Sequence, residues 1–296
     1  MLEFTKLTLA DIRKIRPYFP YSKNKICDNT VGSAFMWRDY FEVEYAEHND
    51  TVIFKAVVKY HNSITAFSPP LGKDYRGSIE AVVEYCRHHG LETVFYNATE
   101  DDLTLLGAIF NEFQAIKYED WSDYLYRAAD LVTLAGRKFS GQRNHINYFK
   151  KAFEGYAFEE ITNDNIADVI EFYDKLTSRL SKDSNVYSEE QAKTVETLVN
   201  FSSYGLLGGM IRVNGSIVAF SLGEIVNNVL FIHVEKADTQ YRGAYQVINN
   251  EFAKHFCSDG VEFINREEDV GDEGLRTSKK SYHPYRILDK HIFITH

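Results

Sequence analysis

The sequence lacks the patterns by which several large enzyme classes are recognised. Its three cysteines are far apart and form no Cys-x-x-Cys pair, which argues against a disulfide framework and a structural zinc site and favours a reducing compartment. The ten histidines show no zinc-site spacing, so we predict no metal. A Gly-x-Ser-x-Gly elbow, a Walker motif and a Rossmann glycine pattern are also missing. These absences argue against motif-defined serine hydrolases, P-loop enzymes and dinucleotide-binding enzymes.

Long apolar segments are missing too. The most apolar region, residues 206–234, is interrupted by Arg212, Asn214 and Glu224, so it cannot span a bilayer as one helix. The first 20 residues mix charged side chains with apolar ones and do not resemble a secretory signal. We therefore expect a soluble, cytoplasmic protein without a transmembrane segment.

The composition is that of a folded protein. Hydrophobic residues make up 44% and aromatic residues 15% of the 296 positions, which is enough for two cores, and the length fits two ordinary domains. The 33 basic and 43 acidic residues give a net charge of −10. This charge argues against a general affinity for nucleic acid but leaves room for a local basic patch.

Hydrophobic periodicity predicts helices and strands along the whole chain. The predicted helices lie at residues 7–18, 30–41, 78–89, 101–113, 165–180, 188–201 and 244–257. The predicted strands lie at residues 43–46, 51–59, 63–67, 93–96, 123–126, 158–160, 208–213, 216–224, 229–234, 261–264 and 286–295. Residues 136–151 contain five basic residues and no acid. We place the boundary between an N-terminal domain, 1–135, and a C-terminal domain, 136–296, at the start of this segment.

The two predicted domains share a short pattern. Tyr75-Arg76-Gly77 opens a predicted helix that leads into a strand, and Tyr241-Arg242-Gly243 opens a second helix that also leads into a strand. Three matching residues alone are not significant, but the order of elements matches as well. We interpret this as a tandem duplication of one α+β unit.

Residues 228–284 have the composition expected of a ligand site. An apolar strand is followed by a polar turn, an amphipathic helix and a second strand, which leads into the polar run Asn265–Arg276. A helix N-terminus offers unpaired N–H groups to an anion, and α/β sheets place ligands at strand ends. We expect the loop after Ile264 and the turn at Arg242 to meet at one cleft.

Several segments together resemble a known family. They are Asp123–Tyr126, Gly136–Phe139, Arg143–Asn147, Tyr241–Gln246, Asn265–Asp269, Gly274–Arg276 and Ser281–Pro284. The chain is similar to the C-terminal domain of phosphatidylglycerol lysyltransferases and its soluble relatives, which are GNAT-like and related to the Fem aminoacyltransferases. The resemblance implies an α+β fold of two tandem GNAT-like domains, each a mixed, mostly antiparallel sheet flanked by helices. It also implies transfer of an aminoacyl group from a charged tRNA to an acceptor.

Aminoacyl transfer needs a base, an oxyanion donor and positive charge for phosphates. The predicted catalytic residues are Asp269, Glu267 and Glu235 as bases and Arg276 as the group that polarises the carbonyl, with Glu268 as a further carboxylate. The predicted substrate-binding residues are Arg242, Tyr245, Gln246, Asn265, Lys279, Tyr282 and Arg143. The alternative is a solvated acidic loop paired with its own basic neighbours.

Two basic segments, residues 137–151 and 276–290, are predicted to hold the acceptor stem of tRNA through its phosphates. The alternative is a solvated helix and a basic tail.

The acceptor would be a small amine or hydroxyl compound or a lipid headgroup. The second hypothesis is a coenzyme A-dependent N-acetyltransferase of a small metabolite. Its co-substrate would be acyl-CoA in place of aminoacyl-tRNA. Only Gly243 supplies a permissive backbone between Thr239 and Gln246, which argues against tight coenzyme A binding. A non-catalytic binding module with the same fold is the third hypothesis.

Overall fold

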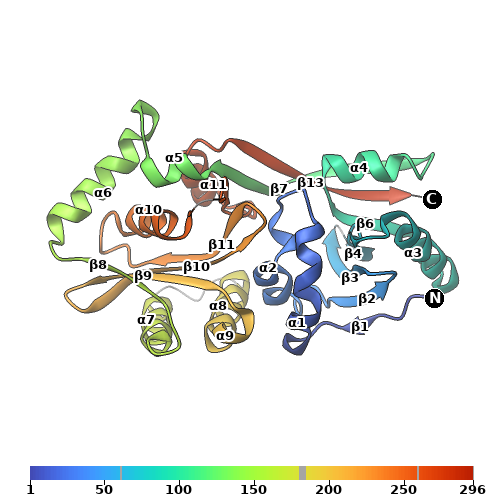
Figure 1. Ribbon diagram of the computed structural model, residues 1–296, viewed down its shortest axis with the longest axis horizontal. Helices are drawn as coiled ribbons and strands as arrows, with labels where there is room; N and C mark the ends of the chain where they lie inside the picture. Colours follow the sequence, from blue (N-terminus) through green and yellow to red (C-terminus); the bar gives the residue numbers. More distant parts are fainter. Residues whose placement is uncertain (61, 180–184, 259, 296) are drawn as a thin grey trace. The chain divides into compact units, whose positions relative to one another are not determined.

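The computed structural model describes residues 1–60, 62–179, 185–258 and 260–295. The chain forms two compact units (Figure 1). The first comprises Met1–Asp123, Glu268–Glu273 and Ile287–His296, and the second comprises Tyr124–Glu267 and Gly274–Arg286. These two units are defined by contacts in space, whereas the predicted domains are defined by a duplicated sequence unit. The division into domains 1–135 and 136–296 therefore stays a prediction.

The first unit contains a mixed sheet. Its strands are β1 (Thr5–Lys6), β2 (Glu44–His48), β3 (Thr51–Tyr60), β4 (Asn62–Phe67), β5 (Leu71–Gly72), β6 (Thr93–Ala98) and parts of β7 (Phe113–Arg127) and β13 (Arg286–Thr295). They are ordered β1-β2-β3-β4-β6-β13-β7, with β5 on β3. The β4–β6 pair is parallel. The helical elements of this unit are η1 (Leu9–Asp11), α1 (Ile12–Ile15), η2 (Arg16–Tyr21), η3 (Cys27–Asn29), α2 (Val31–Met36), α3 (Tyr75–His89) and α4 (Glu100–Gly107).

Local sequence explains the principal helices of the first unit. Asp74 accepts a hydrogen bond from the Gly77 N–H and caps α3, which ends at Gly90 in the left-handed conformation. Thr99 and Asp102 form a capping box at the start of α4. The apolar face of α3 packs into a core that also contains Phe67.

Three predicted helices of the first unit differ from the structure. The predicted helix 30–41 is helical only over α2, which ends at Met36. Residues 7–18 form η1, α1 and η2 in succession, with Pro17 in the first turn of η2 and Pro20 inside it. Proline removes a backbone donor and disfavours a continuous α-helix. The predicted helix 101–113 ends at Gly107, and Phe113 already begins β7.

The second unit is a mixed sheet covered by helices on both faces. Its strands are β8 (Ala157–Glu160), β9 (Leu207–Val213), β10 (Ser216–Val226), β11 (Val229–Ala237) and β12 (Phe263–Asn265), with the end of β7. They are ordered β7-β12-β11-β10-β9-β8, and only the β11–β12 pair is parallel among the pairs of this unit in the described ranges. The helical elements are α5 (Ala128–Thr133), η4 (Arg137–Phe139), α6 (Ser140–Ala152), α7 (Ile166–Ser178), α8 (Asn185–Val199), α9 (Phe201–Tyr204), α10 (Ala244–Phe256) and α11 (Glu273–Lys280).

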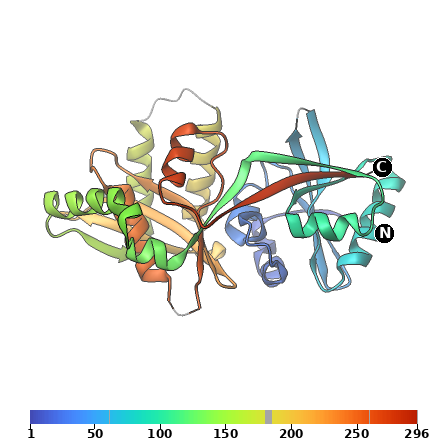
Figure 2. The same cartoon turned by 90° about the horizontal axis from the view of Figure 1, so that it is seen from above.

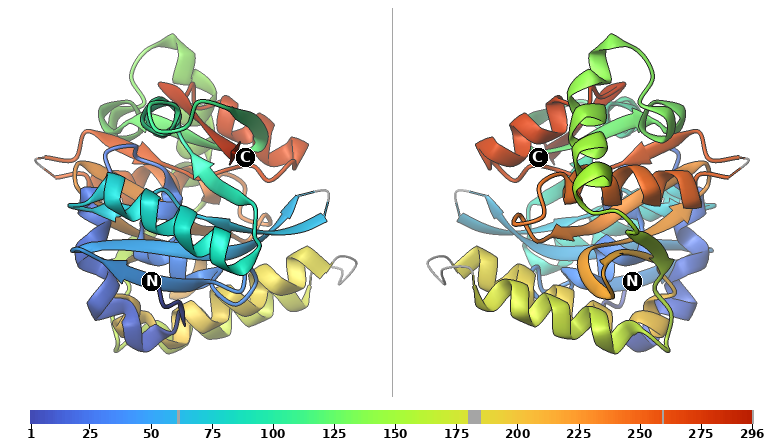
Figure 3. Two further views of the ribbon diagram at one scale, coloured as in Figure 1. Left: turned by 90° about the vertical axis from the view of Figure 1, so that its right-hand side faces the viewer. Right: turned by 90° about the vertical axis from the view of Figure 1, so that its left-hand side faces the viewer.

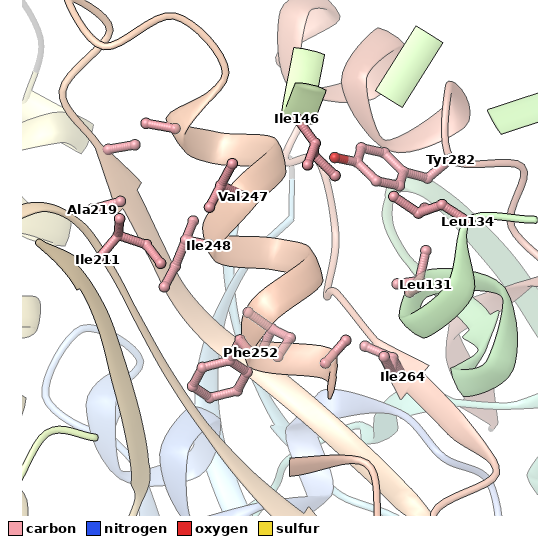
Figure 4. Packing of buried hydrophobic residues seen from close by; sticks show 14 of the residues in the cluster. Leu131, Leu134, Ile146, Ile211, Ala219, Val247, Ile248, Phe252, Ile264 and Tyr282 are labelled. Atoms are coloured by element: carbon pink, nitrogen blue, oxygen red, sulfur yellow. The ribbon is translucent and has the colours of Figure 1, made fainter. Parts of the chain in front are cut away.

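The helix α10 and the pair α7–α8 lie on opposite faces of this sheet (Figures 1 and 3). Figure 2 shows α7 and α8 side by side. On the other face, Val247, Ile248 and Phe252 of α10 point into an apolar core that includes Ile211 and Ile264 (Figure 4). This face, formed by the sheet and α10, carries the first part of the site described below.

A β-bulge in β11 changes the direction of its side chains. Leu222 pairs with Val234, but the next residue of β10, Gly223, pairs with Ile232, so His233 is an extra residue. A Cβ atom at Gly223 would lie 2.2 Å from the Phe231 carbonyl oxygen. The bulge therefore requires glycine at this position.

The parallel strands β11 and β12 are paired over a short distance. Their register joins Val229–Phe231 to Phe263–Asn265. In the described part of the chain the ladder ends there, and β11 continues to Ala237. Carboxyl ends of parallel strands are the usual place for a ligand in an α/β sheet.

The helix α11 is not predicted by the sequence pattern. The run from Asn265 indicates a polar loop that continues into a basic tail, but Glu273–Lys280 is helical. Leu275 is the only large apolar residue in that helix, so hydrophobic periodicity could not detect it.

Candidate functional site

A buried ion pair joins β11 to the residue that follows β12. The Nη2 atom of Arg266 donates to Glu235 Oε1 at 2.8 Å, and Glu235 Oε2 accepts from Asn249 Nδ2 of α10 at 2.9 Å. We call these three residues the Arg266 cluster. Burial by itself lowers the pKa of Arg266, but the charge of Glu235 outweighs burial and the pKa is raised. The guanidinium is therefore a permanent buried cation.

Two tyrosine rings enclose that guanidinium. Its Cζ atom lies 4.8 Å from the ring centre of Tyr282 and 5.9 Å from that of Tyr126. Burial raises the pKa of both tyrosine hydroxyls, so both are neutral. The Tyr126 hydroxyl donates to the Lys279 carbonyl oxygen at 2.8 Å, which fixes the ring beside Arg266.

Two polar atoms of the Arg266 cluster have no hydrogen-bond partner. They are Nη1 of Arg266 and Oδ1 of Asn249, two of the four such buried side-chain atoms found among the described residues. Arg266 is 9% and Asn249 4% exposed. An unpaired buried polar atom costs about 1–3 kcal/mol. Two of them beside one carboxylate mark a place where a ligand would gain hydrogen bonds.

A second polar bridge joins the bulge of β11 to the next residue along the chain. His233 Nδ1 lies 2.8 Å from Glu267 Oε1, and His233 Nε2 lies 3.0 Å from Glu224 Oε1 of β10. Burial alone lowers the pKa of His233, but the two carboxylates raise it to about 10. His233 is therefore an imidazolium at neutral pH, and both ring nitrogens donate.

The backbone of Glu267 is held in the left-handed conformation, with φ of 57°. Its N–H donates to Asn265 Oδ1 at 2.6 Å, and its carbonyl oxygen accepts from Lys279 Nζ at 3.2 Å. A non-glycine residue with positive φ is strained and persists only where neighbours fix it. Glu267 Oε2 accepts no hydrogen bond from any described residue, and the side chain is 20% exposed. Glu267 thus presents one oriented carboxylate oxygen.

The structure brings together about half of the predicted site residues. The predicted residues that lie around the bridges Arg266–Glu235 and His233–Glu267 are Glu235, Glu267, Asn265, Lys279 and Tyr282. Tyr245 is close enough to Glu235 for that negative charge to affect its pKa. Burial raises the pKa of Tyr245 most, and the negative charge of Glu235 raises it further. Lys279 is buried and donates to the backbone carbonyl oxygens of Arg266 and Glu267, so it supports the backbone of the site. Its role in substrate binding stays a prediction.

Three predicted binding residues lie elsewhere in the second unit. The Nη1 atom of Arg143 donates to the carbonyl oxygens of Leu134 and Gly136 and so stabilises the end of α5. Arg242 stacks over the ring of Tyr148, with its Cζ 4.7 Å from the ring centre. The side chain of Gln246, in α10, makes no hydrogen bond within the described ranges. The cleft expected between the Arg242 turn and the loop after Ile264 stays a prediction.

Asp269 and Glu268 belong to the first unit. Asp269 is buried, and its Oδ1 accepts from the Gly271 N–H at 2.9 Å, so the side chain shapes the turn that it begins. Its proposed role as base stays a prediction. Arg276 is half-buried in α11 of the second unit, and its role also stays a prediction.

The first unit contains a buried cation, Lys290. Its ammonium lies 2.7 Å from Asp123 Oδ1, 2.5 Å from Asp28 Oδ2, 3.5 Å from Cys27 Sγ and 3.8 Å from Glu268 Oε2. Cys27, Asp123 and Glu268 have metal-ligand spacing, with their donor atoms within 4.8 Å of one another. The ammonium touches all three, so it takes the place that a metal ion would need. Burial also raises the pKa of the Cys27 thiol, which disfavours the thiolate that metals bind.

The basic segments are less open than predicted. Lys279 and Lys290 are buried, so residues 276–290 do not form a continuous basic face. In the other segment, Lys138 pairs with Asp130 at 3.1 Å and Lys150 with Glu251 at 3.5 Å. Arg137 and Lys151 at the two ends of this segment are exposed.

Sequence reasoning missed four residues of the site: Arg266, Asn249, His233 and Glu224. The sequence analysis considers His233 only among the ten histidines that show no zinc-site spacing, and Arg266 only as a member of the polar run Asn265–Arg276 and of the segment Asn265–Asp269. A polar residue inside an apolar strand is the available signal for both Glu224 and His233, because such a residue needs a partner when buried.

Comparison with known proteins identifies the family. The family described as "Phosphatidylglycerol lysyltransferase, C-terminal" matches residues 19–293. The chain belongs to this family. A crystal structure of a conserved protein of unknown function from Bacteroides thetaiotaomicron is 32% identical, with a TM-score of 0.91 and full coverage of both chains. The structure of L-PGS from Bacillus licheniformis has a TM-score of 0.63 at 15% identity, covering 96% of this chain and 91% of that one.

A curated relative, an uncharacterised protein of Mycoplasmoides gallisepticum, is 27% identical over 180 residues. The match covers 60% of this chain and 57% of that protein, so the chain spans little more than half the length of that relative. The comparisons confirm the predicted lysyltransferase-domain family, and the mixed sheets with flanking helices confirm the predicted α+β class, which the L-PGS structure shares. No helix within the described ranges is long and apolar enough to cross a membrane.

Proposed function

We propose that this member of the lysyltransferase-domain family moves an aminoacyl group from the ester of a charged tRNA to an amine or hydroxyl acceptor. One observation carries the proposal: two charged bridges, Arg266–Glu235 and Glu267–His233, join the parallel strands β11 and β12 just beyond their last paired residues. Strand ends of this kind are where such sheets bind ligands. The family supports the reaction class.

The chemistry follows from the charges. The acceptor oxygen or nitrogen attacks the ester carbonyl carbon, and the bond between that carbon and the ribose oxygen breaks. Glu267 Oε2 accepts the acceptor's proton and returns it to the ribose oxygen that leaves. His233, held by Glu224, keeps Glu267 ionised and oriented. The permanent charge of Arg266 stabilises the developing oxyanion.

The start of α10 offers a place for a phosphate. Gly243 at its N-cap position has no side-chain cap. The Ala244 N–H donates to the Tyr241 carbonyl oxygen, and the next N–H groups of the first turn are those offered to an anion. The phosphate would belong to the 3′ end of tRNA, or to coenzyme A in the second candidate function, N-acetylation of a small metabolite. Gly243 also packs against α6, because a Cβ there would lie 2.5 Å from the His145 carbonyl oxygen. This close approach explains why residue 243 is a glycine, and no pyrophosphate-binding loop is needed to explain it.

A donor and acceptor panel tests the proposal. Purified protein is incubated with a mixed pool of aminoacyl-tRNA, or with acetyl-CoA, and each donor is offered phosphatidylglycerol vesicles and a set of small amines. Mass spectrometry identifies the product. Transfer from charged tRNA is expected, and transfer only from acetyl-CoA favours the second candidate. Absence of product from both donors would favour a non-catalytic module.

A variant pair assigns the role of Glu267. Glu267→Gln should lower the transfer rate by about 10²–10⁴-fold, whereas Glu262→Gln, an exposed glutamate before β12, should leave it unchanged. Comparable rates in the two variants would remove Glu267 from the mechanism. Circular dichroism and thermal unfolding of both variants check that each is folded.

A further inference from the structure

We propose that Arg266 and Asn249 hold the α-aminoacyl end of the donor and require its α-amine to be free, so that N-blocked donors are rejected. The inference rests on the proposed function, because it assigns a part of the same donor to the Arg266 cluster. The observation behind it is the pair of unused hydrogen-bonding atoms, Nη1 of Arg266 and Oδ1 of Asn249.

The two atoms are complementary to an aminoacyl group. Nη1 is a donor and Oδ1 an acceptor. An aminoacyl ester carries an acceptor, the carbonyl oxygen, and a donor, the α-ammonium, on neighbouring carbon atoms. The carbonyl oxygen accepts from Arg266 Nη1, and the ammonium donates to Asn249 Oδ1. An acetylated or formylated amine keeps one N–H but loses its charge and adds an acyl group.

Charge also favours a free ammonium. The carboxylate of Glu235 lies between the two side chains, since it accepts from Arg266 at 2.8 Å and from Asn249 at 2.9 Å. A cation next to Asn249 is therefore close to a buried carboxylate in a medium of low dielectric constant, where opposite charges attract more strongly than in water. A neutral amide at the same place gains nothing from Glu235.

The surroundings keep the cluster in place. The next residue of α10, Asn250, is buried and donates to the carbonyl oxygens of Leu131 and Val132, which ties α10 to α5. The rings of Tyr126 and Tyr282 enclose Arg266. Because Nη1 and Oδ1 are shielded from solvent, the donor must displace a covering side chain, and the Tyr282 ring, the nearer of the two, is the one we assign.

The test compares two forms of one donor. Aminoacyl-tRNA is divided, one half is acetylated on the α-amine, and both halves are offered to the wild-type protein. The transfer rate with acceptor and the dissociation constant without acceptor are measured. The free-amine form is expected to be preferred at least about tenfold, the effect of losing a hydrogen bond to a charged group. Equal transfer and equal binding of the two forms would overturn the inference while leaving the proposed function intact.

Variants assign the preference to the cluster. In Asn249→Leu the acceptor atom is lost, so the preference should fall to within about twofold, with the free-amine donor weakened and the acetylated donor unchanged. Asn111→Leu, the same substitution at an exposed position of the first unit, should retain the full preference. Preference that persists in a folded Asn249→Leu protein overturns the assignment. If that protein does not fold, the donor comparison in Asn249→Ala, which removes the same acceptor atom with a smaller side chain, decides in the same way.

The binding measurement separates the two proposals. If neither donor form supports transfer to any acceptor, the proposed function fails. The ratio of the two dissociation constants then still decides whether the cluster recognises a free α-amine. Equal constants in that case overturn the inference as well.

Discussion

The imidazole of His233 connects two carboxylates from different parts of the second unit. Its Nε2 lies 3.0 Å from Glu224 in β10, and its Nδ1 lies 2.8 Å from Glu267, which follows β12. His233 itself is the extra residue of the bulge in β11. One protonated side chain therefore links three chain segments and places Glu267, so its charge matters for both stability and the proposed reaction.

Stability should fall at alkaline pH because of His233. The pKa of its imidazole is raised from 6.5 to about 10, so between these values the folded chain binds a proton that the unfolded chain has released. The contribution is complete below pH 6.5 and lost as pH rises through 10. We expect the free energy of unfolding to decrease by a few kcal/mol across this window, because one bound proton changes it by at most about 1.4 kcal/mol for each step of one in pH. Urea unfolding at pH 7 and pH 9.5 measures the decrease.

His233→Gln isolates this effect from other titrating groups. The variant should be less stable than wild type at pH 7 by about 3–5 kcal/mol, because two buried carboxylates lose their cation. The difference should shrink at pH 9.5. His255→Gln removes a surface histidine that lies 2.6 Å from Glu160 and should cost about 1 kcal/mol or less. A pH-independent difference for His233→Gln would contradict the assigned protonation.

The ion pair Arg266–Glu235 predicts strong non-additivity. Arg266→Met leaves Glu235 buried without its cation and should cost about 3–5 kcal/mol. The double variant Arg266→Met/Glu235→Leu leaves neither charge and should be more stable than the single variant. The exposed pair Arg76–Glu80, at 3.1 Å, is the control, and Arg76→Met should change stability by about 0.5 kcal/mol or less. Urea midpoints of the variants give the coupling. Additive effects at Arg266 and Glu235 would mean that the pair is not buried in solution.

Much of the fold could be predicted because its signals are local. Asn214-Gly215 fixes a tight turn by its own backbone preferences, and β9 and β10 flank it as expected. The helix α10 ends at Phe256, one residue before its predicted end. By contrast, α11 contains a single large apolar side chain, Leu275, and is anchored by the buried Lys279. That anchor is a tertiary contact, which no local pattern reveals.

The site could be predicted only in part for the same reason. Glu235 and Glu267 are found because carboxylates near strand ends stand out in a sequence. Their partners Arg266 and His233 depend on the register of β11 against β10 and β12, and a bulge shifts that register at His233. A one-residue shift changes which side chains share a face. Bulges of this kind leave no dependable signal in a single sequence.

Binding of tRNA should depend on the exposed ends of the basic segment 137–151. Arg137→Ala/Lys151→Ala removes two exposed cations and should lower the slope of log Kd against log salt by about 1.4–1.8, because each phosphate contact releases about 0.7–0.9 of a counterion. Arg13→Ala/Lys23→Ala removes the same charge from exposed positions of the first unit. Filter binding of tRNA at several salt concentrations gives the slopes. Equal slopes for the two variants would show that binding follows net charge alone.

Gly223, opposite the bulge in β11, should not tolerate even the smallest side chain. Gly223→Ala should cost at least about 2 kcal/mol, because its Cβ would lie 2.2 Å from the Phe231 carbonyl oxygen and backbone must move to admit it. Gly141 in α6 has open space around its Cβ position, so Gly141→Ala should instead stabilise by about 0.5–1 kcal/mol. Thermal unfolding compares the two. Because the bulge places His233 and hence Glu267, folded Gly223→Ala protein should also transfer more slowly than wild type. Wild-type stability and rate in Gly223→Ala would mean that the bulge does not control the site.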